Sequence, residues 1–136
     1  MDFSQSFTTG FSLAAGATGV NGTAFTSAVV SIPKQAHAGS ITVTFTPAGG
    51  SASTVQFYFQ VSHDKGATWT NYVDPVTGLE YIAVATNHAA IGSGVIAVTR
   101  WLDLRGFDSI QLASVVNNDA TNALTAVNAS IGFNIV

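Results

Sequence analysis

The chain has 136 residues, of which 47% are hydrophobic and only 8% are charged, and its formal net charge is −3. A globular chain usually carries about 25% charged residues, and with four Lys and Arg residues this one lacks the basic surface of a nucleic-acid-binding protein. The absence of cysteine excludes a disulfide framework and thiolate chemistry, and the length predicts one domain with a substantial core.

The first 24 residues differ in composition from the rest of the chain, because large aromatic residues alternate there with Ser, Thr, Gln and Gly. The aromatic residues recur every four positions, at Phe3, Phe7 and Phe11. Two interpretations stay open. The segment is either the first strand of the fold, with Asn21-Gly22 as a hairpin turn, or an extended arm. In the second case the three Phe side chains are partner-binding anchors, and the arm joins a neighbouring subunit by strand addition.

Residues 25–136 are predicted to form the main domain, built from strands and turns throughout. Apolar and polar residues alternate strictly over residues 40–46 and again over residues 55–61, which is typical of strands with one face in a core. Further strand patterns lie at residues 81–84, 95–102, 108–116 and 124–135. We count about eight or nine strands at regular spacing, which predicts an all-β fold, an antiparallel β-sandwich or jelly roll.

One turn has a recognisable motif, Ser62-His63-Asp64-Lys65-Gly66-Ala67-Thr68-Trp69. This pattern, S-x-D-x-G-x-T-W, resembles the Asp-box, a β-hairpin turn known from the propellers of sialidase-like enzymes. A single copy in 136 residues is too little for a propeller, so a structural hairpin is expected. The carboxylate would accept hydrogen bonds from the turn, the glycine would supply a positive φ, and the indole would cover the hairpin. The structural residues of this turn are Ser62, Asp64, Gly66, Thr68 and Trp69.

No catalytic constellation is recognisable, so we expect no enzyme activity, no metal and no cofactor. The three histidines, at positions 37, 63 and 88, lack the spacing of a metal site. The loop at residues 117–122 offers oxygen ligands for calcium, but Asp119 is its only charged residue. Exposed aromatic side chains could instead stack on a sugar, and the candidates are Trp69, Tyr72, Tyr81 and Trp101.

Neither a signal peptide nor a membrane span is recognisable. Residues 3–33 carry no charge, but glycines interrupt them before an apolar run of about 20 residues can form. We therefore expect a protein that is made and assembled in a cytoplasm. Because mixed surface charge normally keeps a monomer soluble, the sparse charge predicts that partners cover much of the surface.

A short all-β chain without cysteine that is rich in Thr, Ala, Val and Asn resembles the virion proteins of tailed bacteriophages, and residues 57–69 and 104–112 are similar to hairpins of phage head-decoration and tail proteins. The similarity covers about half of the chain and lies in local motifs. The resemblance implies a capsid decoration or cement protein of the virion, assembled in the host cytoplasm. It implies a homotrimer that binds a major capsid protein, without nucleic acid or membrane. No functional residue carries over. The alternatives are a carbohydrate- or receptor-binding module of a phage tail, and a tail or baseplate component.

Overall fold

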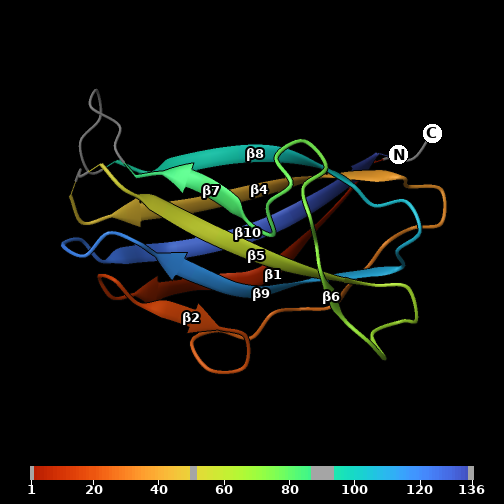
Figure 1. The fold of residues 1–136 in the computed structure, drawn as a ribbon, viewed down its shortest axis with the longest axis horizontal. Helices are drawn as coiled ribbons and strands as arrows, with labels where there is room; N and C mark the ends of the chain where they lie inside the picture. Colours follow the sequence, from red (N-terminus) through yellow and green to blue (C-terminus); the bar gives the residue numbers. More distant parts are fainter. Residues whose placement is uncertain (1, 50–51, 87–93, 135–136) are drawn as a thin grey trace.

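A computed structural model describes residues 2–49, 52–86 and 94–134 of the chain. These residues form strands, turns and connections, and they contain no helix that could cross a membrane (Figure 1). The strands are β1 (Asp2–Leu13), β2 (Thr18–Val20), β3 (Val30–Ser31), β4 (Ala38–Pro47), β5 (Thr54–Ser62), β6 (Thr70–Asn71), β7 (Ile82–Ala85), β8 (Ile96–Asp103), β9 (Ser109–Asn117) and β10 (Leu124–Asn134).

The strands form two antiparallel sheets, one of four strands in the order β1-β10-β4-β8 and one of six. In the six-stranded sheet, β9 and β5 lie at the centre; β2 and β3 pair with one side of β9, and β6 and β7 pair with one side of β5. When each of these short pairs is counted as one strand, the order is that of a jelly roll. The predicted antiparallel sandwich with jelly-roll character is therefore confirmed.

The core lies between the two sheets, and in most long strands it is formed by alternate residues. In β4 and β5 the buried positions alternate with half-buried or exposed ones, as the sequence pattern predicts. Phe45 of β4 and Phe57 of β5 are both fully buried, and their ring centroids lie 6.2 Å apart across the sandwich. Burial of each such side chain contributes about 1.5–3 kcal/mol, so this contact helps to hold the two layers together.

The N-terminal segment is a strand of the sandwich. β1 pairs with β10 from Asp2 opposite Asn134 to Leu13 opposite Leu124. Phe7 is 1% exposed, and its ring centroid lies 5.4 Å from that of Phe59 in the opposite sheet. This corrects the partner-binding role expected for Phe7, because an anchor needs an exposed ring and this ring is part of the chain's own core.

The other two proposed anchors have different surroundings. The ring of Phe11 is half-buried and stacks on Phe25, with a centroid distance of 4.7 Å. The side chain of Phe3 lies outside the described residues, although its backbone pairs with Phe133 in the sheet. Of the two interpretations of residues 1–24, the strand is therefore the one that the structure contains.

The turn predicted at Asn21-Gly22 is present, but it does not connect two strands of a hairpin. Gly22 has a φ of 92°, which the lack of a Cβ permits. The strands on either side, β2 and β3, both pair with β9 instead of with each other. The expectation of a hairpin is wrong because β2 and β3 lie in the same sheet and pair with different parts of β9.

The edges of both sheets carry features that oppose the addition of a foreign strand. β1 has three register shifts along its pairing with β10, and bulges of this kind twist an edge out of plane. On β8, exposed Arg100 alternates with buried Ile96 and Leu102, so a charge interrupts the apolar side of that edge. The edges of the six-stranded sheet consist of strands two to four residues long. Contacts with partners are therefore expected on faces or connections.

The buried position of Phe7 yields a stability prediction. Phe7→Ala should lower the free energy of unfolding by about 3–5 kcal/mol, because it leaves a cavity between β1 and β5. Urea denaturation measures the effect, and Ser4→Ala on the exposed side of the same strand is the matched control, with a change within about 0.5 kcal/mol. Wild-type stability of Phe7→Ala combined with a loss of self-association would favour the arm instead.

Candidate functional site

The turn between β5 and β6 is closed by one carboxylate and one hydroxyl. The Ser62 hydroxyl donates to Asp64 Oδ1 at 2.6 Å and accepts the backbone N–H of Gly66 at 2.9 Å. The hydroxyl of Thr68 donates to Asp64 Oδ2 at 2.5 Å, and its backbone N–H donates to Oδ1 at 2.9 Å. The polar residues of the motif thus bond to one another and to the backbone of the turn.

The remaining motif residues shape the same turn. Lys65 and Gly66 have φ values of 58° and 87°, a left-handed pair that lets the chain reverse. A Cβ added at Gly66 would lie 3.2 Å from Cζ2 of Trp69, so the indole covers this glycine closely. Glycine is needed here both for its backbone conformation and for the space under the indole.

A residue far along the chain ties this turn to the body of the protein. The backbone N–H of Lys65 donates to both carboxylate oxygens of Asp108, at 3.0 and 3.2 Å. The Asp108 backbone N–H donates in turn to the carbonyl of Ser62 at 2.8 Å, and Ser109 donates its hydroxyl to Asp108 Oδ1. The turn is therefore fixed to the connection between β8 and β9.

The hydrogen bonds also determine the charge state of Asp64. Donation from the Ser62 hydroxyl, then from the hydroxyl and N–H of Thr68, keeps the pKa of the Asp64 carboxyl well below its usual 3.8. A general base needs a pKa near the working pH. Asp64 is therefore suited to hold the turn and unsuited to accept a proton during catalysis.

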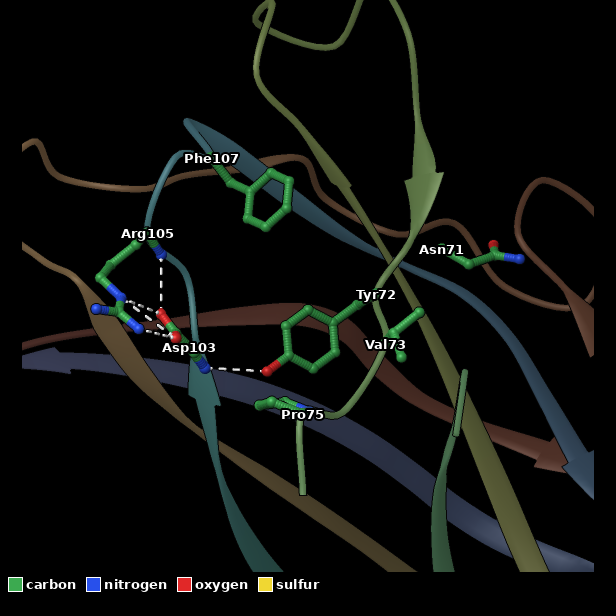
Figure 2. Close-up of a pocket in the computed structure, with 7 residues that line it drawn as sticks. All are labelled: Asn71, Tyr72, Val73, Pro75, Asp103, Arg105 and Phe107. Atoms are coloured by element: carbon green, nitrogen blue, oxygen red, sulfur yellow. Dashed lines mark hydrogen bonds and ion pairs between the residues drawn. The ribbon is translucent and has the colours of Figure 1, made fainter. Parts of the chain in front are cut away.

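A hollow of about 440 Å³ lies between the β6–β7 connection and the end of β8 (Figure 2). The Tyr72 hydroxyl and the Arg105 guanidinium both point toward Asp103 in Figure 2. The backbone N–H of Asp103 donates to the Tyr72 hydroxyl at 2.9 Å. Its carboxylate accepts from Arg105 Nε at 2.9 Å and from the terminal nitrogen at 2.6 Å. The lining residues are Asn71, Tyr72, Val73, Pro75, Asp103, Arg105 and Phe107.

The titratable groups of this hollow hold their ordinary charges at neutral pH. The hydrogen bonds from Arg105 lower the pKa of Asp103, and the same pairing raises the pKa of Arg105. Burial raises the pKa of the Tyr72 hydroxyl above 10.0. Each shift moves the pKa of the group further from neutral pH, so none of the three groups is poised to exchange a proton at neutral pH.

The loop considered for calcium uses its oxygens internally. Asp119 is 2% exposed, and its Oδ1 accepts the backbone N–H groups of Thr121 and Asn122 at 2.9 and 3.1 Å. The amide of Asn122 donates to Oδ2 at 3.0 Å. The described residues contain no cluster of three or more His, Asp or Glu side chains arranged for a metal, and His88 lies outside them.

The aromatic candidates for sugar stacking differ in exposure. Trp69 is half-buried over its turn, Tyr72 is 6% exposed, and Tyr81 is half-buried with its ring centroid 5.4 Å from that of Tyr58. Trp101, on the edge strand β8, is 71% exposed. Among the described aromatic side chains it is the one that is widely accessible.

The outer faces of both sheets lack charged side chains in the part of the chain that the structure describes. The charged residues lie in connections or at a strand end, apart from Arg100 on the edge of β8. On the four-stranded sheet, one row across the strands carries four hydroxyls in register: Ser6, Ser130, Thr42 and Thr99. The sequence shows that charged residues are few, but only the strand register shows that they are absent from the described outer faces of the two sheets.

One end of the sandwich is also poor in charge. The connections β1–β2, β4–β5 and β9–β10 lie together at the end opposite the start of β1 and the end of β10 (Figure 1). In these connections the described residues 14–17, 48–49, 52–53 and 118–123 contain one charged residue, Asp119, which is buried. The uncharged faces therefore continue around this end of the molecule.

Comparisons with known proteins give no family for the chain. No protein-family model matches it, and no curated protein matches it. It is similar to a chain of Bacillus endospore appendages, described as disulfide-linked pili, at 11% identity over 99% of this chain and 89% of that one, with a TM-score of 0.43. It is also similar to PRD1 vertex protein P5, at 13% identity over 96% of both chains and the same TM-score of 0.43. At these values the likenesses carry no conclusion about activity or partners.

The Ser62 hydroxyl should stabilise the fold measurably. Ser62→Ala removes the partner of the Gly66 N–H and of one Asp64 oxygen at a position that is 1% exposed. We expect a loss of about 1–3 kcal/mol in the free energy of unfolding. Chemical denaturation checks this value, with Ser12→Ala on the exposed side of β1 as the control. Equal effects of the two substitutions would contradict the role of the hydroxyl.

The lowered pKa of Asp64 predicts a pH-dependent contribution to stability. The folded state favours the ionised carboxylate, so its stabilising effect is present above the usual pKa of 3.8 and is lost as the pH falls toward the folded value. The stability difference between the wild type and Asp64→Asn should be constant near neutrality and shrink below about pH 4. Denaturation midpoints between about pH 2 and 7 measure it. A difference that does not change with pH would contradict this prediction.

Proposed function

We propose that the protein is a non-enzymatic structural component of a phage virion, a decoration or cement protein that stabilises the head by protein–protein contacts. In this proposal it forms a homotrimer and binds the major capsid protein. The observation that carries the proposal is the absence of charged side chains from the described outer faces of both sheets.

The placement of charge favours a covered surface. Interface cores are depleted in Lys, Glu and Asp relative to other protein surface, and the two outer faces share this depletion. The chain exposes 6886 Å². A standard interface takes about 800 Å² from each partner, so two such contacts in a trimer would cover roughly a quarter of this surface. The uncharged end would remain for a capsid.

The chemistry of the titratable groups agrees with a structural role. Asp64, Asp103 and Asp108 each accept several hydrogen bonds from neighbouring groups. The pKa shifts of Asp64, Asp103 and Tyr72 all lead away from neutrality. The described part of the chain therefore uses these groups to fix turns and connections.

Association should be visible in solution and should be sensitive to a charge placed on the contact surface. We expect a trimer in light scattering at tens of micromolar, and co-sedimentation with phage heads. Single lysine substitutions would locate the contacts: Ser130→Lys on the four-stranded sheet, Ser114→Lys on the six-stranded sheet and Ala120→Lys at the uncharged end. A lysine within a contact should weaken association by about tenfold or more.

Thr77→Lys, in the exposed β6–β7 connection, is the control and should leave association unchanged. A strict monomer at high micromolar concentration that also fails to sediment with heads would overturn the proposal. If Ala120→Lys alone loses head binding and still forms a trimer, the result would support trimer contacts on the sheet faces and capsid contacts at the uncharged end.

A further inference from the structure

Trp101 stands at the end of a transverse row of small residues on the outer face of the four-stranded sheet. It lies opposite Ser40 on β4, which lies opposite Gly132 on β10, which in turn lies opposite Ser4 on β1. Serine and glycine rise little above the sheet, so the indole projects beside a low floor. Its 71% exposure shows that the neighbouring side chains leave most of it uncovered.

This arrangement forms an open hollow of about 410 Å³ beside the indole. Small-molecule sites usually measure about 300–1,000 Å³. The floor comes from Ala38, Gly39 and Gly132, and the polar groups on its rim come from Gln35, His37 and Ser40. Gly39 is fixed by the core, because a Cβ there would lie 2.9 Å from Ile131 Cδ1. Packing beneath the sheet therefore helps to keep the floor flat.

The lining specifies the chemistry of a ligand. No Asp, Glu, Lys or Arg lines the hollow, so it holds no permanently charged side chain to compensate a ligand charge. The indole offers a flat apolar face, while the amide, imidazole and hydroxyl groups offer hydrogen-bond donors and acceptors. A matching ligand is neutral, with an apolar face and an edge of hydroxyls. A pyranose ring has both, since its axial C–H groups form one face and its hydroxyls the rim.

We propose that this hollow, the Trp101 site, binds one ring of a neutral saccharide, with the ring stacked on the indole and its hydroxyls bonded to Gln35, His37 and Ser40. Beyond the hollow, the row of Ser6, Ser130, Thr42 and Thr99 continues the polar face, with Thr42 Oγ1 and Thr99 Oγ1 3.1 Å apart. A saccharide chain can extend over these hydroxyls. This proposal and the structural role proposed above use the same face of the four-stranded sheet, so a contact between copies of the chain that covered this row would exclude the saccharide chain from it.

At Trp101 itself, a protein partner is less well matched than a saccharide. A Trp at the centre of a protein interface is usually ringed by residues that exclude water. On the outer face, the in-register neighbours of Trp101 are instead Ser40 and Gly132, with Thr99 two residues along β8. A flat apolar partner would contact one indole and would desolvate these hydroxyls without pairing them. A sugar supplies an apolar face for the indole and hydrogen-bond partners for the hydroxyls.

The experiment uses the full chain with Trp69→Phe, which leaves Trp101 as the single indole of the two in the sequence. Its fluorescence is titrated with maltotriose, cellotriose and the trimer of N-acetylglucosamine. From ligand efficiency, a single stacked ring should bind with a dissociation constant of about 1 mM. A parallel sedimentation assay with amylose, cellulose and chitin distinguishes a free oligosaccharide from a surface polysaccharide as the source of the ring.

Two variants test the site itself, each in the chain with its natural Trp69 and read by NMR chemical shifts. Trp101→Ala removes the stacking face, and Gly132→Val fills the floor while the indole stays. Each should weaken saccharide binding by about tenfold or more, a loss expected when a stacking ring or its space is removed. Val76→Ala, which trims a 90% exposed side chain elsewhere, should have no effect. Melting temperatures confirm that all three variants fold.

The proposal is overturned if no saccharide of the set changes the emission or the shifts at about 20 mM, well above the expected dissociation constant. It is also overturned if binding survives both site variants. A third result, in which Trp101→Ala dissociates the homo-oligomer while saccharides have no effect, would assign the indole to a contact between copies of the chain.

Discussion

The packing of the two sheets is the constraint on which the rest of the structure depends. The long strands bury most of their inward-facing residues between the layers, and the rings of Phe45 and Phe57 meet across this interface. Because successive side chains alternate between faces, the same rule sends Ser, Thr, Gln and Asn outward along β4, β5 and β10. The uncharged outer faces are therefore set by the residues between the core positions, and they can vary without disturbing the core.

The long strands could be predicted because alternation carries that information locally. Residues 40–46 and 55–61 show the pattern without interruption, and both lie in the strands expected of them. β2, β3 and β6 are two or three residues long, too short for alternation to be recognised. The N-terminal strand was ambiguous for another reason. A spacing of four residues is a multiple of the strand period and is also close to the helical one, so Phe3, Phe7 and Phe11 fit both.

The residues that close the turn could be predicted from the sequence, but the hydrogen bonds that fix the turn to the rest of the protein could not. Ser62, Asp64 and Thr68 are close in the chain, so their hydrogen bonds follow from a local motif. Asp108 is 43 residues from Lys65, and only the placement of β9 beside β5 brings the two together. The Trp101 site required still more of the fold, since its residues come from three strands and a connection. The sequence marks Trp101 as a candidate, but its exposure depends on the small residues that the register sets beside it.

Protected edges and uncharged faces together limit how this protein can interact. Bulges on β1, the charge of Arg100 on β8 and the short outer strands of the other sheet all oppose backbone pairing with a partner. Contacts must then be made by side chains on the faces or by the connections at the ends. Short hydroxyl side chains on a rigid sheet lose little conformational freedom when they bind, which lowers the entropic cost of a contact. Each such group alone contributes little binding free energy, so a stable contact must be extended or must be repeated by symmetry. An assembled lattice meets that condition, whereas a small ligand meets it only where an indole adds its own surface, as beside Trp101.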